Sequence, residues 1–350
     1  MAQTMLNAMN LRSRLAVLFL LILCIILPSA AHVPVTADGN TDIRTAYPVE
    51  IPNKSYVMYG HLHQAGEPGW YQLRMKPGDR LVVSLMTPGY NTSVPDMVVM
   101  SPGTSLSPGE QPLSINVPEG YRAEIIKGGA PRSAAHEPFS PAAVFEVASY
   151  SRENTTPELY YLAIVSSANE TSYSIAVGYV EEFTPLEWVL VPVNVITTHL
   201  WEGQSILVIL TPFLAVVIFG FIVISRRESR KGPRMTYSGW LATIAGLCYL
   251  GGAAITVVQM VRAIAVTGLA SSVAVTLVFA IIPMVLGIWM LRIGRQSSGM
   301  TIHNRIFLVL IAILGSVFWA GLVIGPVIAI AAAAFPQKIK PPPEKMQGDE

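Results

Sequence analysis

Apolar residues follow different patterns in the two halves of the chain. Between residues 55 and 182 they occur in short runs, where they alternate with polar positions and are separated by turns rich in proline and glycine. After residue 204 they form long uninterrupted stretches. Alternation with period two is typical of β-strands, whereas about 20 consecutive apolar residues suffice for a helix that crosses a membrane. The pattern therefore predicts an all-β domain followed by a helical membrane domain.

The all-β domain is predicted to span residues 32–184 as a jelly-roll-like sandwich of about 8–9 strands. Tyr71, Leu73 and Met75 share one face of a strand, and Tyr173, Ile175, Val177 and Tyr179 share a face of another. Residues 76–79 have proline second and glycine third, as a type II turn requires. The predicted strands are 55–63, 70–75, 80–87, 96–101, 112–117, 121–127, 143–150, 159–166 and 172–181.

The helical domain, residues 205–335, is predicted to contain four transmembrane helices at 206–225, 237–258, 266–291 and 306–334. None has a charged residue in its middle that would mark a transport path. Gln259 and Arg262 lie near the outer end of the second helix, where an arginine can reach the interface. Trp188 and Trp201 flank a semi-apolar stretch before the first helix, and aromatic residues favour the membrane interface. Residues 185–204 are therefore interpreted as a juxtamembrane linker on the outer leaflet, with a last strand of the β domain as the alternative.

The N-terminus has the pattern of a secretory signal peptide. Arg12 and Arg14 precede an apolar run at 15–27, and the small residues Ser29 and Ala31 follow it. The run is short for a bilayer span, so residues 1–31 are predicted to be a signal peptide. An uncleaved anchor helix is the alternative.

The distribution of charged residues agrees with export of residues 32–200. Only 13% of the residues are charged, against about 25% in ordinary soluble domains, which argues against a cytosolic enzyme. Residues 32–200 carry nine basic and 17 acidic side chains, whereas residues 201–350 carry 12 and five. A basic cluster follows the first predicted helix and consists of Arg226, Arg227, Arg230, Lys231 and Arg234.

Positively charged loops stay in the cytoplasm, so this cluster fixes the predicted orientation. We expect a multi-pass plasma-membrane protein with residues 32–200 on the extracytoplasmic side. Four crossings would also place the proline- and lysine-containing tail, residues 336–350, outside. Its three lysines run against the rule, so a re-entrant or tilted fourth segment is the alternative. The basic cluster is interpreted as a topology signal, with a site for anionic lipid headgroups or an acidic partner as the alternative.

Part of the β pattern resembles a known family. Residues 69–85 resemble the opening strands of the pre-peptidase C-terminal type of bacterial and archaeal sandwich, residues 96–100 its next core strand, and residues 159–165 and 171–178 its closing pair. The resemblance covers about a third of the chain, within 55–182, and a Pro/Gly/Ser-rich insertion at 102–141 departs from it. It implies an accessory, non-catalytic exported module.

Four asparagines fit the N-glycosylation pattern, and all fall in the predicted outside region: Asn53, Asn91, Asn154 and Asn169. Since such turns also arise by chance on exposed surfaces, an unmodified surface is the alternative. We expect some of them to be glycosylated if the host has the pathway.

Few residues suggest metal binding or catalysis. His61 and His63 share one face of a predicted strand and would bind a metal only with a third ligand such as Glu67, Asp79 or His136, so a solvated strand face is preferred. No glycine-rich phosphate loop, His-Glu-x-x-His or nucleophile elbow is present, and a triad assembled by folding leaves no local signature. No catalytic residue, metal or cofactor is therefore predicted.

Gly321 and Gly325 form a small-xxx-small pattern in the predicted fourth helix. Packing among the helices of this chain is the preferred interpretation, with association with a partner or a second copy as the alternative.

The sequence thus favours a membrane-embedded binding, sensing or envelope-organising module. Its expected partners are the lipid bilayer, a membrane or envelope protein, and a glycan or peptide ligand, but no nucleic acid. An accessory subunit of a membrane transport or export complex is the first alternative. An extracytoplasmic hydrolase or glycan-modifying factor is the second.

Overall fold

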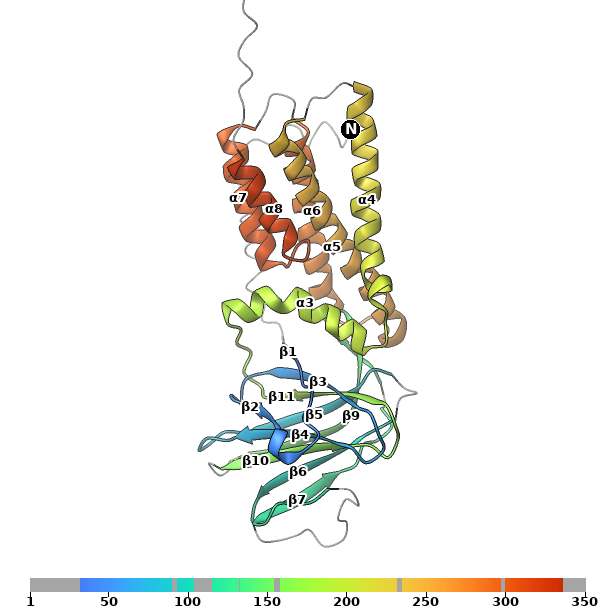
Figure 1. The fold of residues 1–350 in the computed structure, drawn as a ribbon, viewed down its shortest axis with the longest axis vertical. Coiled ribbons are helices and arrows are strands. Elements are labelled where there is room, and N and C mark those ends of the chain that lie inside the picture. The colour runs from blue at the N-terminus through green and yellow to red at the C-terminus, as the bar shows by residue number, and fades with distance from the viewer. Residues whose placement is uncertain are drawn as a thin grey trace, which may run out of the picture. The chain divides into compact units, whose positions relative to one another are not determined.

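The computed structural model describes residues 32–89, 93–103, 115–131, 133–153, 158–231, 235–296 and 300–335. The predicted signal peptide and tail, together with Asn91, Asn154 and Arg234, lie outside these residues. Strands come first along the described chain and α-helices follow (Figure 1). The chain divides into two compact units. The β unit contains the residues up to Thr211 together with Ile255–Ala280, and the helical unit contains Pro212–Ala254 and the residues from Ile281 onward.

The strands form two sheets. The six-stranded sheet has the order β1 (Val33–Thr36), β3 (Tyr56–Leu62), β11 (Thr171–Val177), β5 (Leu81–Thr87), β9 (Ala142–Arg152) and β8 (Ala135–Glu137). The five-stranded sheet has the order β2 (Tyr47–Val49), β4 (Pro68–Arg74), β10 (Leu159–Val165), β6 (Asp96–Pro102) and β7 (Tyr121–Ile126). Neighbouring strands are antiparallel except for β1 with β3 and β2 with β4.

Both sheets contribute side chains to one hydrophobic core. Tyr71 of β4 and Tyr173 of β11 come from different sheets, are fully buried, and their hydroxyl oxygens are 3.0 Å apart in a hydrogen bond. Leu73 and Met75 are also buried, whereas Arg74 between them is exposed. The predicted alternation along this strand is therefore confirmed.

The predicted strands correspond to β3–β7 and β9–β11. The prediction for 112–117 is wrong where it can be checked, because Ile115 and the two residues after it form no strand; Ile115 instead packs in a small cluster around Trp70. The prediction that Tyr179 shares the buried face of β11 is also wrong. Gly178 adopts a left-handed φ of 84°, which ends the strand at Val177 and leaves Tyr179 43% exposed.

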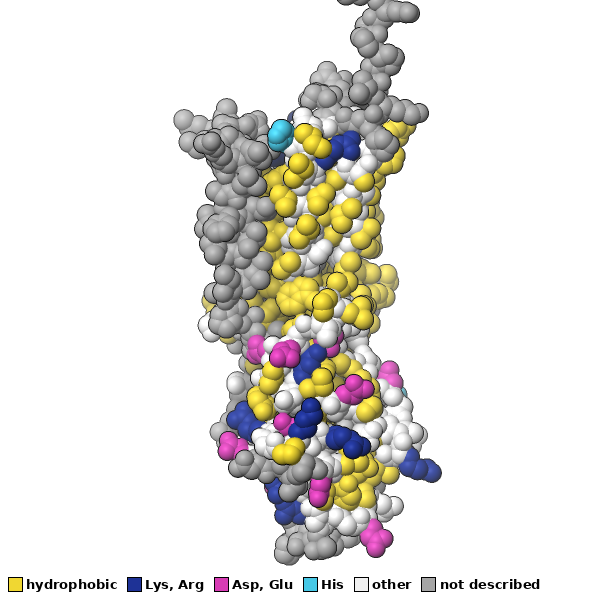
Figure 2. All heavy atoms as spheres, turned by 90° about the vertical axis from the view of Figure 1, so that its left-hand side faces the viewer, with side chains coloured by type: hydrophobic (Ala, Val, Ile, Leu, Met, Phe, Trp, Pro, Cys, Tyr) yellow, Lys and Arg dark blue, Asp and Glu magenta, His cyan; other side chains and the backbone are white. Residues whose placement is uncertain are grey.

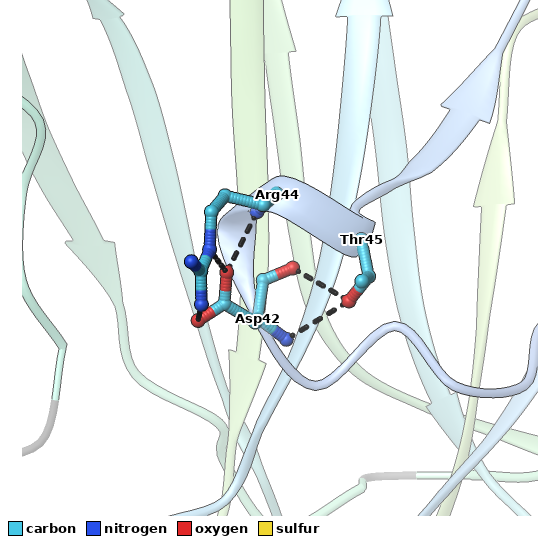
Figure 3. A network of polar contacts seen from close by, with 3 residues as sticks. All are labelled: Asp42, Arg44 and Thr45. Carbon is cyan, nitrogen blue, oxygen red and sulfur yellow. Dashed lines mark hydrogen bonds and ion pairs between the residues drawn. The ribbon is translucent and has the colours of Figure 1, made fainter.

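Three short strands at sheet edges escaped prediction: β1, β2 and β8. Pro34 and Pro48 interrupt the alternation in the first two, and an edge strand tolerates proline because one side of its backbone needs no partner. Between them lies the short 3-10 helix η2 (Ile43–Thr45), capped by Asp42 (Figure 3). The Asp42 carboxylate accepts hydrogen bonds from the backbone N–H and Nε of Arg44, each at 2.9 Å.

The segment predicted as a juxtamembrane linker is the helix α3 (Pro185–Trp201), so the alternative of a last strand is wrong. Thr184 and Glu187 form a capping box at its start, with Pro185 in the first turn. Because α4 (Ile206–Lys231) runs past the predicted end at residue 225, the residues from Arg226 to Lys231 belong to a helix rather than to a loop.

Three helices among the described residues are long and apolar enough to cross a membrane. They are α4, α5 (Tyr237–Thr267) and α6 (Val273–Gly294). Figure 2 shows a helical surface covered by hydrophobic side chains, whereas charged side chains of both signs are scattered over the β domain.

The predicted helix at 306–334 is not continuous. It is replaced by α7 (Ile302–Val317) and α8 (Ile324–Ala334), which at roughly 1.5 Å per residue are about 24 and 16 Å long and too short for a core of about 30 Å. Trp319, Gly321, Leu322 and Val323 in the connecting turn have φ between 50° and 67°. The two helices lie side by side as an antiparallel hairpin, because Arg305 in the first turn of α7 bonds to carbonyl oxygens at the end of α8 (Figure 1).

Candidate functional site

Helix α3 is fastened to the β domain along its length. At its start Lys54 Nζ lies 2.7 Å from the Glu187 carboxylate, and the lysine is only 6% exposed. In its middle Asn194 donates to the carbonyl oxygen of Pro34 at 3.1 Å. At its end Trp201 Nε1 donates to the carbonyl oxygen of Tyr173 at 3.0 Å. These contacts lie within the β unit, so α3 and the strands form one body.

The ion pair changes the titration of its carboxylate. Burial by itself raises the pKa of Glu187, but the hydrogen bonds from Lys54 and from Thr184 act the other way, and the net pKa is lowered. A charged Glu187 is thus held opposite a charged lysine.

A polar network begins where α3 ends. Glu202 accepts hydrogen bonds from Nδ1 of the fully buried His199 at 2.8 Å and from Nε2 of Gln204 at 3.0 Å. Gln204 and Gln259 of α5 exchange amide hydrogen bonds at 3.0 and 2.9 Å. His199 is the donor in this pair, since a carboxylate oxygen accepts. Its Nε2 has no hydrogen-bond partner within the described part of the chain.

A second set of contacts joins β8 and the loop after it to the first turns of α6. His136 Nε2 lies 3.0 Å from Thr276 Oγ1, which donates to the carbonyl oxygen of Pro138 at 2.8 Å. Ser272 donates to the carbonyl oxygen of His136 at 3.2 Å. Burial raises the pKa of the neighbouring Glu137 to about 7 and lowers that of His136. The β unit therefore includes contacts to the C-terminal part of α5 and to the first turns of α6.

A cavity of about 450 Å³ opens beside the polar network. This volume is typical of small-molecule sites. Four segments contribute to its wall: the turn after β5, the start of β9, the residues after α3 and the C-terminal part of α5. The lining residues are Pro88, Gly89, Pro141, Ala143, Phe145, Glu202, Gln204, Gln259, Arg262, Ala263 and Val266. Its polar groups are one carboxylate, one guanidinium and the paired amides, set among apolar side chains.

The cavity is suited to recognising a small charged or zwitterionic group. Glu202 is largely buried, with 14% of its side chain exposed, whereas Arg262 is exposed. In the part of the chain that the structure describes, the Arg262 guanidinium has no hydrogen bond or ion pair. The wall therefore offers a held negative charge and an open positive one.

The predicted histidine pair is brought together without a third ligand. The rings of His61 and His63 have centroids 4.9 Å apart, and His61 Nδ1 lies 3.0 Å from Ser172 Oγ. Glu67 bonds to the backbone N–H of His63, and His136 bonds to Thr276 instead. Across the described residues no group of three or more His, Cys, Asp or Glu side chains can hold a metal ion.

Two of the four predicted glycosylation positions can be placed. Asn169 is exposed in the turn between β10 and β11, and its side-chain oxygen accepts from the backbone N–H of Ala65 at 2.8 Å. Asn53 is half-buried in the turn before β3. Of these two, Asn169 is the accessible one.

Gly321 and Gly325 pack within this chain but not as one helix face. Gly321 lies in the turn between α7 and α8, and Gly325 lies in the first turn of α8. A Cβ atom at Gly325 would come within 2.6 Å of the Tyr249 ring of α5, and one at Gly252 of α5 within 2.8 Å of the backbone N of Gly321. Arg226, Arg227 and Arg230 are exposed at the end of α4.

The cavity could not be found from any local motif, because its wall comes from four distant segments. The one available signal was the pair Gln259 and Arg262 at the end of an otherwise apolar helix, and it did not indicate Glu202 or Gln204. No protein-family model matches this chain, and no curated protein matches it either.

Proposed function

We propose that the chain is a multi-pass plasma-membrane protein whose extracytoplasmic β-sandwich is a binding or sensing module in direct contact with the outer ends of its membrane helices. The observation that carries this proposal is the cavity, whose wall combines β-domain loops with α3 and α5. A ligand that fills it touches the β domain and a membrane helix together. Its binding energy can therefore favour one arrangement of these elements over another.

The attachment of the β domain supports coupling rather than simple anchoring. A flexible tether would need one span and no contacts, whereas here α3, α5 and α6 all form hydrogen bonds to the β domain or to its network. Among the described residues, those that line the cavity include no serine, threonine, cysteine or lysine. The resemblance to the pre-peptidase C-terminal sandwich supports the same assignment of a non-catalytic module.

The membrane topology that fits best is three spans followed by a re-entrant hairpin. Helices α4, α5 and α6 cross the membrane, and α7 and α8 enter and leave from the side on which α6 ends. This arrangement places the lysines of the tail on the cytoplasmic side with the basic cluster, as the positive-inside rule requires. The proposal therefore adopts the re-entrant alternative in place of an extracytoplasmic tail.

A thermal-shift screen of the full-length protein in detergent tests the binding proposal. The panel contains glycans, peptides and headgroup analogues, and the variant Ala143→Phe fills the cavity. Ala135→Phe places the same side chain at an exposed position on the neighbouring strand β8 and serves as the control. A compound that stabilises the wild type and the control, but not Ala143→Phe, supports the proposal. Stabilisation of all three proteins alike, or of none, contradicts it.

The alternative of an accessory subunit is favoured by α4. Only 6% of the residues in its most apolar segment are buried, against 61% in that of α5 and 50% in that of α6. A photo-crosslinking residue in place of Phe219, which is 71% exposed, distinguishes a lipid-facing helix from one that packs against a partner. A crosslinked protein of defined mass supports the subunit function, whereas adducts with lipid alone contradict it.

A further inference from the structure

We expect the polar part of the cavity wall to lie near the level of lipid headgroups. The apolar stretch of α4 begins at Ile206, two residues after Gln204. In α5 the polar residues Gln259 and Arg262 interrupt a sequence that is apolar before them and apolar again at 263–266. These two glutamines are hydrogen-bonded to each other, so both helices place the edge of the hydrocarbon core at the same height. Arg262 is one helical turn farther out, in the headgroup layer.

An exposed apolar residue lies one turn before Arg262 on the same face of α5. Val258, four residues before Arg262, is 40% exposed. A surface with an open guanidinium above and an exposed aliphatic side chain below matches a molecule with an anionic head and hydrocarbon chains. The guanidinium fork bonds phosphate oxygens in a bidentate manner, which a lysine cannot do.

The other polar groups complement the remainder of a headgroup. Glu202 accepts two hydrogen bonds through one carboxylate oxygen, Oε2. Its second oxygen can accept from an ammonium or hydroxyl group attached to the phosphate. Apolar residues such as Phe145 and Pro141 exclude water around the head and strengthen these bonds.

We propose that the cavity binds the phosphate-bearing headgroup of an outer-leaflet lipid, with Arg262 on the phosphate and Glu202 on the attached donor group. This inference rests on the proposed binding function and names its ligand class. A free phosphate ester has the same head chemistry but no hydrocarbon chains that would contact Val258. Binding of a lipid should therefore depend on the apolar face of α5, whereas binding of a free phosphate ester should not.

The test uses the full-length protein, reconstituted into phosphatidylethanolamine vesicles and then extracted in mild detergent. Native mass spectrometry measures the phospholipid retained per chain in the wild type, in Arg262→Gln and in Val258→Asn. Arg295→Gln is the matched control. Arg295 is an exposed arginine that directly follows the C-terminal end of α6 and does not line the cavity. Thermal unfolding confirms that each variant is folded, and Arg262→Lys replaces Arg262→Gln if the latter is not.

The expected result is one retained phospholipid on the wild type and on Arg295→Gln, with at least a tenfold loss in Arg262→Gln and in Val258→Asn. For Arg262→Lys the expected loss is smaller but measurable. If glycerol 3-phosphate competes fully with the lipid and binds equally well to Val258→Asn, that result would overturn the assignment of a lipid as the ligand and would identify a soluble phosphate ester instead. Equal retention by Arg262→Gln and Arg295→Gln would overturn the phosphate site. If a soluble compound of the thermal-shift panel still requires the open cavity in that case, the binding function stands without the lipid.

Discussion

Arg305 in the first turn of α7 donates a hydrogen bond from Nη1 to the carbonyl oxygen of Ala333 in the last turn of α8, at 2.6 Å. Its Nη2 donates to the carbonyl oxygen of Phe335 at 2.8 Å. The last carbonyl groups of a helix have no partner inside it, and a cation there also complements the helix dipole. One side chain therefore satisfies the end of α8 and holds both ends of the hairpin together.

This contact predicts that the tail faces the cytoplasm. A single cysteine is introduced as Gln347→Cys in a Cys24→Ser, Cys248→Ser background and treated with a membrane-impermeant maleimide on intact cells. We expect no labelling until the membrane is permeabilised, because α7 and α8 return the chain to the side from which it entered. Glu170→Cys in the exposed β10–β11 turn is the control and should label directly. Direct labelling of the tail would mean that the fourth segment crosses the membrane.

The hairpin should be sensitive to any side chain at Gly315. The Tyr249 hydroxyl donates to the carbonyl oxygen of Ile311 at 3.2 Å, and a Cβ atom at Gly315 would overlap the tyrosine ring. We expect Gly315→Ala to lower the free energy of unfolding by about 1–3 kcal/mol, the usual cost of overpacking. Ser316→Ala, at the exposed neighbouring position, should have a much smaller effect. Thermal unfolding in detergent measures both, and equal midpoints would refute the close contact.

The β domain was largely predictable because its strands alternate. Buried Tyr71 and Leu73 next to exposed Arg74 are a direct consequence of the pleat. Helix α3 was missed because its many valines and its proline favour extended structure over helix. The start of α3 nevertheless has a recognisable sequence signal, because Thr184 and Glu187 have the spacing of a capping box.

The break between α7 and α8 was signalled only weakly. Residues 306–334 are long and apolar enough for one helix, and only Gly321, Gly325 and Pro326, together with the lysines of the tail, pointed to a kinked or re-entrant segment. The left-handed turn around Gly321 is stabilised by its close approach to Gly252 of α5, a contact between positions far apart in the sequence. The cavity is hidden for the same reason, because Ala143, Glu202 and Gln259 meet only after folding.

The attachment of α3 to the β domain should depend on Lys54. Its ammonium group is buried against the Glu187 carboxylate, so Lys54→Met leaves that carboxylate without its countercharge. We expect a loss of about 2–4 kcal/mol in the free energy of unfolding, less than for a fully buried pair because the Glu187 side chain is 26% exposed. Arg44→Met breaks the exposed pair with Asp42 (Figure 3) and should cause no measurable change. Hydrogen exchange of α3 provides a local readout, and unchanged protection in Lys54→Met would argue against a fastening role.

Glu137 should make stability depend on pH in a defined window. Burial raises the pKa of its carboxyl group from 4.5 to about 7, with a smaller contribution from Glu181. The folded protein therefore keeps this proton at pH values where the unfolded chain has lost it. The stabilisation is complete below about pH 4.5 and disappears as the pH rises through about 7.

Glu137→Gln removes this titration and should not alter stability at about pH 4, but should raise it by roughly 1–3 kcal/mol at about pH 8. The lowered pKa of the neighbouring His136 acts in the opposite direction, with stability falling as the pH drops through its range. His136 is present in both proteins, so the difference between the wild type and Glu137→Gln isolates the carboxyl group. Glu146→Gln, at an exposed position on β9, is the control. Denaturant unfolding of the full chain across this pH range gives the comparison, and parallel profiles for wild type and Glu137→Gln would show that Glu137 titrates normally.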